Sequence, residues 1–322
     1  MLYLNEDHLR SVGINWHDTI GVIERVVKCL ASGDFSQPVK PYLRYRDLKN
    51  RIIAMPAFVG GGFDMAGIKW IASFPDNLQK GFPRAHSTVI LNNAETGEPV
   101  CMINTAFLSI IRTASVSGLM IQRYGSVRSL RKIKLGIIGW GPIGQYHCKM
   151  CHKVFGNKID RTYVYDIRKI DNVLLESEYM DKVVICDDWP AAYTDADLVI
   201  TCTVAKSPYI TLNPKTGSLH LNVSLRDYSV EVFEYFKDAI IVDSWDEVCR
   251  ENTDIERMHR EKGLQKNDTK TIIDVVLHNA ISDYAQDAAI LFNPMGMAVF
   301  DIALASFYYR KALESRVGVP LI

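Results

Sequence analysis

The stretch IIGWGPIGQYHCKMCH, residues 137–152, contains two cofactor signatures that overlap. The first is G-x-G-x-x-G, which binds a dinucleotide when it joins a strand to a helix. The second is C-x-x-C-H, which attaches a c-type haem. A haem on the helix after the glycine turn would displace a dinucleotide, so only one signature can apply. The surrounding sequence decides between them.

Beyond residue 132 the chain alternates between short β-branched apolar runs and stretches of helical character. Runs of this length, separated by enough residues for crossovers, predict a parallel sheet covered on both faces. Right-handed crossovers would wind it into a doubly wound Rossmann fold, so the predicted class is α/β. The predicted strands are IKLGIIG (133–139), TYVYD (162–166), KVVICD (182–187), DLVITCT (197–203), LHLNVS (219–224) and AIIVDS (239–244).

The glycine turn therefore follows a predicted strand and precedes a predicted helix, which makes a weak motif specific. Its first glycine permits a tight turn, the second lets the backbone approach a pyrophosphate, and the third lets helix and strand pack closely. The helix N-terminus offers free N–H groups to the phosphates. The residues assigned to cofactor binding here are Gly139, Gly141, Pro142, Ile143 and Gly144.

Asp166 ends the second predicted strand, where a carboxylate can accept hydrogen bonds from the adenosine ribose. A negative charge there repels a 2′-phosphate, so we expect NAD rather than NADP. Arg168 follows closely and is a further candidate contact to the cofactor, which could soften this preference.

The haem interpretation is disfavoured by composition. The chain has seven cysteines, an odd number, which indicates reduced thiols in the cytoplasm, whereas haem c is attached outside it. We interpret Cys148, Cys151 and His152 as ordinary helix residues, with a redox pair as the alternative. A second cysteine pair at metal-ligand spacing does not occur, so we expect no metal site.

Charge and hydropathy exclude other classes. The 37 basic and 37 acidic residues balance, so we expect no nucleic-acid or anionic-membrane partner. The N-terminus lacks a basic region followed by an apolar one, so we expect no export signal. The apolar stretch 288–307 contains Asn293, Pro294 and Asp301, which would be costly in a bilayer. We predict that it forms a buried loop and helix.

The first 130 residues predict a largely β substrate domain that begins with an amphipathic helix near 16–32. The segment NNAETGEP (92–99) reads as a hairpin loop, and 105–125 as a helical link to the Rossmann domain. The predicted domains are 1–128, for substrate binding and dimerisation and joined by a C-terminal helix at 302–322, and 129–301, for NAD binding.

Three basic residues and one acid are the candidate reactive groups. Lys69 in GIKWI, Arg112 in LSIIRTASV and Arg44 in KPYLRYRD lie in apolar surroundings. A buried cation needs a negative partner, either a substrate carboxylate or an internal salt bridge, unless its head reaches water. Burial would also lower the pKa of Lys69 and suit it to proton transfer. Asp227 follows the fifth predicted strand, where it serves either catalysis or a turn.

Taken together, the segments QPVKPYLR, RIIAMP, GIKWI, RTASVS, VITCTVAKSPYI and LNPMGMA resemble the ornithine cyclodeaminase and mu-crystallin family over nearly the full chain. The resemblance implies that Lys69 and Asp227 are catalytic, Asp227 as the acid and Lys69 in proton transfer. It places Arg44, Arg112 and Met55 at the substrate. Further contacts to the cofactor fall on Thr113, Thr203, Val204, Asn293 and Met295.

Within this family the chain resembles a branch that cleaves N-(2-amino-2-carboxyethyl)-L-glutamate oxidatively with NAD, and the resemblance implies the same reaction, with 2,3-diaminopropionate for siderophores and 2-oxoglutarate as products. The text SLRDYSVEV around Asp227 lacks the glycine and Pro-Gly of true cyclodeaminases, which disfavours ornithine cyclisation. Open alternatives are ornithine cyclodeaminase, a ketimine reductase, an alanine dehydrogenase, or a non-catalytic binder of nucleotide and small ligand. The role of His86, in FPRAH, stays open.

The resemblance also implies a homodimer, built through the N-terminal β domain, that acts on a small amino-acid substrate. The cysteine count and the expected lack of an export signal indicate a cytoplasmic location. A pyridoxal-phosphate-dependent synthase is the expected pathway partner.

Overall fold

The computed structural model describes residues 1–171 and 177–321, which form two compact units. The units are Met1–Arg112 with Gly296–Ile322, called unit 1, and Thr113–Met295, called unit 2. The division falls within helix α3 (Phe107–Val127), whereas the expected domain ranges assign this whole helix to the first domain.

Unit 1 is built on a mixed sheet with strand order β16-β1-β7-β6-β5-β4-β2, to which β3 adds by pairing with β4. Neighbouring strands are antiparallel except β1 and β7. The predicted hairpin loop joins β6 to β7. The strands are β1 (Leu2–Asn5), β2 (Phe35–Ser36), β3 (Tyr42–Leu43), β4 (Arg51–Val59), β5 (Met65–Ser73), β6 (Ala85–Asn93), β7 (Pro99–Asn104) and β16 (Val319–Pro320).

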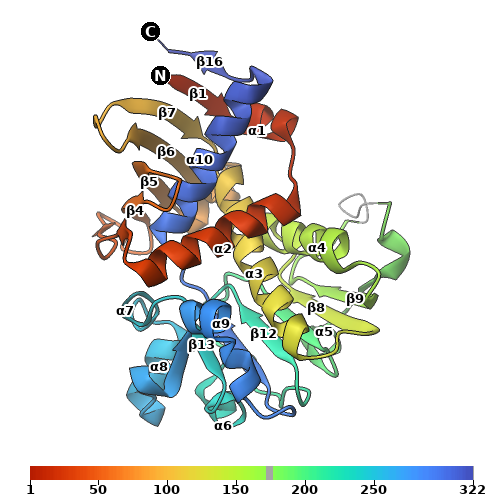
Figure 1. The fold of residues 1–322 in the computed structure, drawn as a ribbon. Coiled ribbons are helices and arrows are strands. Elements are labelled where there is room, and N and C mark those ends of the chain that lie inside the picture. The colour runs from red at the N-terminus through yellow and green to blue at the C-terminus, as the bar shows by residue number, and fades with distance from the viewer. Residues whose placement is uncertain (172–176, 322) are drawn as a thin grey trace. The chain divides into compact units, whose positions relative to one another are not determined.

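The helices of unit 1 pack on one face of this sheet. α10 (Ala298–Ser315) lies against β4, β5 and β6 and against α2 (Trp16–Ser32), and α1 (Glu6–Val12) also contacts α10 (Figure 1). The Asn15 side chain caps α2 by accepting from its first backbone N–H groups, and Gly33 ends it in a left-handed conformation. The predicted amphipathic helix at 16–32 is therefore present, with its apolar stripe in the core.

Strand alternation divides the sheet into two chemically different faces. On β5, Gly67 and Lys69 point to the side of α10, since a Cβ added to Gly67 would lie 3.1 Å from Ile302 Cδ1. Ile68 and Trp70 point to the opposite side, and Trp70 is 44% exposed.

Unit 2 contains a sheet in which every pairing is parallel, with order β10-β9-β8-β11-β12-β15-β13-β14. The strand order reverses between β8 and β11, and helices such as α4 and α5 pack against the strands. Each predicted run forms one of these strands, so the predicted doubly wound α/β class is confirmed. The strands are β8 (Ile133–Ile138), β9 (Ile159–Tyr165), β10 (Val183–Ile185), β11 (Leu198–Thr201), β12 (Leu219–Asn222), β13 (Ile240–Val242), β14 (Thr269–Thr271) and β15 (Ile290–Asn293).

The helices of unit 2 connect these strands along the chain (Figure 1). Besides the part of α3 from Thr113 on, the α-helices that the structure describes in unit 2 are α4 (Pro142–Phe155), α5 (Trp189–Tyr193), α6 (Phe233–Phe236), α7 (Trp245–Val248), α8 (Asp254–Lys262) and α9 (Ile272–His278).

The prediction of a buried loop and helix over 288–307 is wrong for the first part of this segment. Its first part is not a loop: β15 lies fully buried between β12 and β13. The strand lies inside the longer apolar stretch 288–307, so the sequence did not mark it as a separate run. The expected C-terminal helix at 302–322 is also shifted, because α10 starts at Ala298 and ends at Ser315 before β16.

Candidate functional site

The glycine turn lies between β8 and α4, where the strand order of unit 2 reverses. Gly139 has φ +102°, and a Cβ there would lie 2.6 Å from the backbone of Cys202. A Cβ on Gly144 would lie 2.0 Å from the Gly139 carbonyl oxygen, so α4 can approach β8 only with glycine here. Both positions are needed to close the turn itself.

Gly141 differs from these two glycines. A Cβ at Gly141 would meet nothing within 4 Å, and the residue is the N-cap of α4. Its small size therefore leaves open space in front of the helix N-terminus, which is where a pyrophosphate binds in such turns. These residues fit a dinucleotide.

Asp166 lies just beyond β9 beside this turn. Its carboxylate accepts from the backbone N–H of Trp140 at 2.7 Å and of Arg168 at 2.9 Å. Arg168 also pairs with it through Nε at 3.2 Å. Burial raises the pKa of Asp166, but the hydrogen bonds from Arg168 and Trp140 outweigh it and hold the pKa below its usual value. The acid is thus ionised at the edge of the candidate cofactor site.

The cysteines of α4 are packed into the interior of unit 2. Cys148 and Cys151 are fully buried, and burial raises the pKa of Cys151 well above its usual value. His152 stacks on Tyr179 with ring centroids 4.3 Å apart. All seven cysteines are free thiols. In the described ranges 1–171 and 177–321, no group of His, Cys, Asp and Glu side chains is arranged to hold a metal ion.

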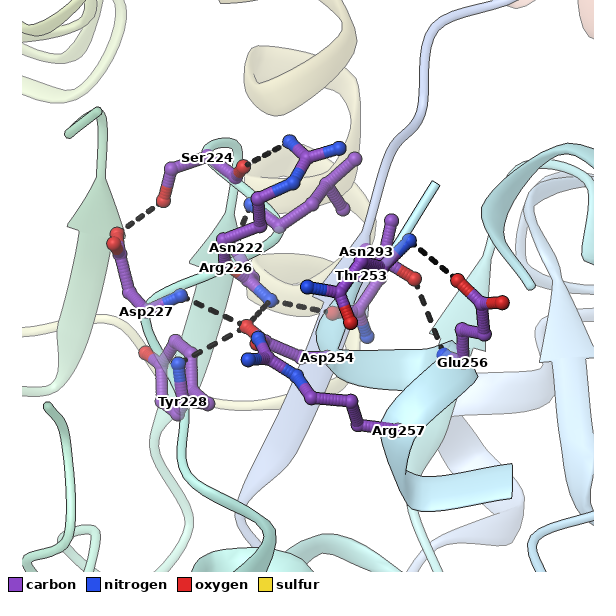
Figure 2. A network of polar contacts seen from close by, with 12 residues as sticks. Asn222, Ser224, Arg226, Asp227, Tyr228, Thr253, Asp254, Glu256, Arg257 and Asn293 are labelled. Atoms are coloured by element: carbon purple, nitrogen blue, oxygen red, sulfur yellow. Dashed lines mark hydrogen bonds and ion pairs between the residues drawn. The ribbon is translucent and has the colours of Figure 1, made fainter. Parts of the chain in front are cut away.

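Asp227 lies at the carboxyl edge of the same sheet and is completely buried. Its carboxylate accepts hydrogen bonds from the hydroxyl groups of Thr203, after β11, and Ser224, after β12. Figure 2 shows the Ser224 bond and the backbone of Asp227 beside Asp254. Burial raises the pKa of Asp227, and the two hydroxyl groups oppose this by stabilising the carboxylate. The position suits a general base that titrates above the usual range of an aspartate.

The other expected cofactor contacts of unit 2 occupy different environments. Thr203 donates to Asp227, Val204 is 62% exposed, and Met295 N–H donates to Asp243 at 3.1 Å. The Asn293 side chain is buried, accepts from Asn222 at 2.8 Å and donates to the Leu291 carbonyl at 3.2 Å.

Unit 1 contains a buried charge cluster that joins three elements. Lys69 on β5 and Arg112 on α3 both donate to Oδ1 of Asp301 on α10, at 3.0 and 3.1 Å. Lys69 and Asp301 are at most 1% exposed, and Arg112 is 9% exposed. Within the described residues, the second carboxylate oxygen, Oδ2, receives no hydrogen bond. Two cations therefore share one carboxylate, which leaves one positive charge in excess among these three groups.

The pKa values in this cluster follow from burial. Burial lowers the pKa of Lys69 to about 8, although the charge of Asp301 raises it. Burial opposes ionisation of Asp301, but the charges of Arg112 and Lys69 hold its pKa below the usual value. Lys69 is consequently poised to exchange a proton near neutral pH.

The backbone of Gly296, from the LNPMGMA motif, packs closely against the guanidinium group of Arg112. A Cβ on Gly296 would lie 2.7 Å from Arg112 Nη1, and the residue has φ +86°. The buried Lys40 ammonium donates to the Gly296 carbonyl at 2.7 Å. This glycine is required both by the conformation and by the close approach of Arg112.

Three further candidates of unit 1 are placed as follows. Met55 is buried on β4 directly opposite Lys69 in the register of β5. His86, on β6, is exposed. Arg44 is also exposed and stacks on Tyr42, with 5.1 Å from its Cζ to the ring centroid, so the expectation of a buried Arg44 is wrong. The apolar residues around it in the sequence are themselves exposed.

Sequence reasoning missed Asp301 and Asp254 as site residues. Asp301 is the single acid in the apolar run MAVFDIALA, and the same rule that drew attention to Lys69 and Arg112 applies to it. Asp254 carried no such signal, because it lies in the polar stretch ENTDIER. No helix within the described chain is long and apolar enough to cross a membrane.

Comparison with known proteins gives consistent matches along the whole chain. The model of the ornithine cyclodeaminase/mu-crystallin family matches residues 8–316. N-((2S)-2-amino-2-carboxyethyl)-L-glutamate dehydrogenase of Staphylococcus aureus is 32% identical, covering 100% of this chain and 98% of the relative. Alanine dehydrogenase of Archaeoglobus fulgidus is 25% identical, with 98% and 97% covered.

Solved structures show the same fold. Thermococcus litoralis Δ1-pyrroline-2-carboxylate reductase, in complex with NADH and L-proline, superimposes with a TM-score of 0.89 at 23% identity and full coverage of both chains. An archaeal alanine dehydrogenase dimer with bound NAD gives a TM-score of 0.84 at 23% identity, covering 100% of this chain and 99% of that one.

Proposed function

The chain belongs to the ornithine cyclodeaminase/mu-crystallin family, and we propose that it is an NAD-dependent dehydrogenase of amino acids. The substrate we propose is N-(2-amino-2-carboxyethyl)-L-glutamate, cleaved to 2,3-diaminopropionate, a siderophore precursor, and 2-oxoglutarate. The main support for this function is the buried carboxylate of Asp227, which lies at the carboxyl edge of the sheet that contains the glycine turn. Full-length identity of 32% to a dehydrogenase of this amine supports the choice of substrate.

The glycine turn and Asp166 would hold the cofactor. The N–H groups at the N-terminus of α4 would bind the pyrophosphate, and the ionised Asp166 would accept hydrogen bonds from the adenosine ribose. Arg168, Thr113, Thr203, Val204, Asn293 and Met295 are proposed as further contacts. When bound, NAD supplies a hydride acceptor for the carbon next to the bridging nitrogen.

The rest of the reaction is hydrolysis. Loss of the hydride and of the N–H proton leaves a carbon–nitrogen double bond in the substrate. One water molecule adds to it, and collapse gives a ketone and a primary amine. Asp227 takes the proton from the attacking water, which needs a carboxylate that is ionised yet basic. Lys69 carries a proton to the leaving nitrogen, which its lowered pKa permits.

The cations of unit 1 would orient the substrate through its carboxylates. The excess positive charge of the Lys69, Arg112 and Asp301 cluster is compensated when an anionic group binds there. Arg44, exposed at the surface of unit 1, is proposed as a second carboxylate contact, and Met55 as an apolar one. Holding the carboxylates fixes which hydrogen is removed.

The test is a direct assay. The protein is incubated with NAD and, separately, with the proposed amine, ornithine, alanine and proline. Absorbance of reduced nicotinamide is recorded, and products are identified by mass spectrometry. We expect NAD to be reduced only when the proposed amine is present. The products should then be 2,3-diaminopropionate and 2-oxoglutarate in equal amounts.

Other outcomes identify the remaining alternatives. Proline formed from ornithine without net reduction indicates a cyclodeaminase, and reduction with alanine or proline indicates an alanine dehydrogenase or a ketimine reductase. Tight binding of NADH without turnover of any of these amino acids indicates a non-catalytic binder. Each of these results contradicts the proposed substrate.

We also propose that the enzyme is a cytoplasmic homodimer, paired through unit 1. The sheet face opposite α10 presents Ile68 and the exposed Trp70. The free thiols agree with a reducing compartment. A clean monomer in sedimentation at micromolar concentration would contradict the dimer. A pyridoxal-phosphate-dependent synthase that supplies the amine is the proposed pathway partner.

A further inference from the structure

The loop that carries Asp227 has a conformation that its own residues do not favour. It leaves β12 at Asn222, and Leu225 has φ +64°. A left-handed leucine costs about 1–2 kcal/mol relative to an ordinary conformation, so other contacts must hold the loop.

A carboxylate at the start of α8 supplies these contacts. Oδ2 of Asp254 accepts from the backbone N–H of Asp227 and of Tyr228, both at 3.0 Å, and from the Asn222 side chain at 2.9 Å (Figure 2). The backbone N–H of Asp254 donates to the Leu225 carbonyl at 2.8 Å. Asp254 is 1% exposed. One buried residue therefore contacts the loop at its start, at its strained position and at its end.

The remaining oxygen of Asp254 is also occupied. Oδ1 accepts from Arg257 at 2.5 Å, within the same helix. Every one of these partners of the carboxylate is a donor, so only the ionised form satisfies them all. An asparagine at this position would turn an NH2 group toward a donor on one side or the other.

The position of Asp227 depends on this arrangement. Its carbonyl accepts from the N–H groups of Tyr209 and Ile210, at 2.9 and 2.8 Å, while its N–H is held by Asp254. With both ends of the residue fixed, the side chain reaches the hydroxyl groups of Thr203 and Ser224.

We infer that Asp254 is a positioning residue for the reaction, which sets the orientation and the charge environment of Asp227 without contact to substrate or cofactor. This inference rests on the proposed role of Asp227 as the base. It adds that the Asp254 side chain holds Asp227 in the orientation that this role requires.

The pKa of Asp227 depends on the ionisable groups around it, and the pH dependence of kcat/KM reports that pKa. Besides Asp254 they include Cys202, Tyr209 and Tyr228, and burial raises the pKa of each of these three, so they stay neutral at working pH. Two cations also lie in this network: Arg226 donates to the Ser224 and Glu251 carbonyls, and Arg257 pairs with Asp254 (Figure 2). Asp254 is thus the nearby negative charge, and its charge raises the pKa of Asp227. Removing it should lower that pKa.

The experiment compares Asp254→Asn with the wild-type protein in three measurements: kcat and KM, the pH dependence of kcat/KM, and amide hydrogen exchange of residues 222–230. We expect kcat to fall about a hundredfold, as displacement of a catalytic group can cause, with unchanged affinity for NADH. The acidic limb of the pH profile should move to lower pH. Exchange in 222–230 should become at least about tenfold faster as the loop is released.

The matched control is Glu247→Gln, which removes another buried carboxylate that pairs with an arginine three positions on, Arg250. It should leave the acidic limb and the exchange of 222–230 unchanged. If Asp254→Asn behaves like this control, the inference is wrong.

A second variant covers the case that Asp254→Asn does not fold. Asp254→Glu keeps the charge but moves it by one methylene, and should lower kcat while leaving the acidic limb in place. Wild-type kcat in this variant would overturn the inference. If the wild-type protein oxidises no amine, the proposed function fails, whereas the exchange measurement still decides whether Asp254 holds the loop.

Discussion

Lys69 on β5 and Asp301 on α10 are 232 positions apart in the sequence and form a buried ion pair, with 3.0 Å between Nζ and Oδ1. Arg112 shares the same oxygen at 3.1 Å. In the sequence, Asp301 stood out only because a charged residue is unfavourable in a membrane. In the structure it is the ion-pair partner of Lys69 and Arg112, the two proposed substrate contacts.

Asp301→Asn should destabilise the protein strongly. It leaves two buried cations without their carboxylate, which typically costs about 3–5 kcal/mol of unfolding free energy. Urea unfolding followed by tryptophan fluorescence measures the change. Glu314→Gln, at an exposed ion pair with Lys311 on the same helix, is the control and should have no measurable effect. Equal effects of the two changes would contradict the importance of the cluster.

The pH dependence of kcat/KM should have an alkaline limb near pH 8. Burial lowers the pKa of Lys69 to about 8, so above this pH its ammonium loses the proton needed to bind a carboxylate and to protonate the leaving nitrogen. The charge of Asp301 raises that pKa, and in folded Asp301→Asn the limb should move to lower pH. If the alkaline limb does not move in Asp301→Asn, it reports the titration of a group other than Lys69.

Asp227→Asn should lower turnover strongly but spare the cofactor site. An amide cannot take a proton from water, and loss of a general base lowers kcat by about 10²- to 10⁴-fold. Titration of NADH fluorescence should give an unchanged Kd, because the glycine turn is intact. Near-normal kcat would remove Asp227 from the mechanism.

Asp166→Ser should weaken discrimination against NADP. Serine still accepts a hydrogen bond but no longer repels a 2′-phosphate, and the preference for NAD should fall by about tenfold, equivalent to about 1.4 kcal/mol. Ratios of kcat/KM with the two cofactors measure this. Arg168→Gln, with Asp166 retained, is the control and should not improve use of NADP. An unchanged ratio in Asp166→Ser would contradict the ribose role.

The two glycines around α4 should separate cofactor binding from folding. Gly144→Ala places a methyl group 2.0 Å from the Gly139 carbonyl oxygen and should lower Tm. Gly141→Ala meets no protein atom within 4 Å, so Tm should hold while NADH binds more weakly. Thermal unfolding and NADH titration of both variants provide the check. Unchanged NADH affinity in Gly141→Ala would argue against a pyrophosphate at this turn.

The sequence was sufficient to predict the Rossmann unit because its signals are local. Each predicted strand is a short apolar run that ends in a turn, and the glycine pattern stands between a strand and a helix. Among the strands that the structure describes in this unit, β14 and β15 were missed: β14 has the polar sequence TKT, and β15 lies inside the longer apolar stretch 288–307.

The apolar segments around Lys69 and Arg112 indicated by themselves that these cations need a negative partner, because burying an unpaired charge is costly. Only the tertiary structure identified that partner as Asp301 and placed Arg44 at the surface. It alone also showed that Asp254 accepts hydrogen bonds from the backbone N–H groups of Asp227 and Tyr228. Contacts between residues far apart in the chain depend on how sheets and helices pack, and a local pattern carries no information about them.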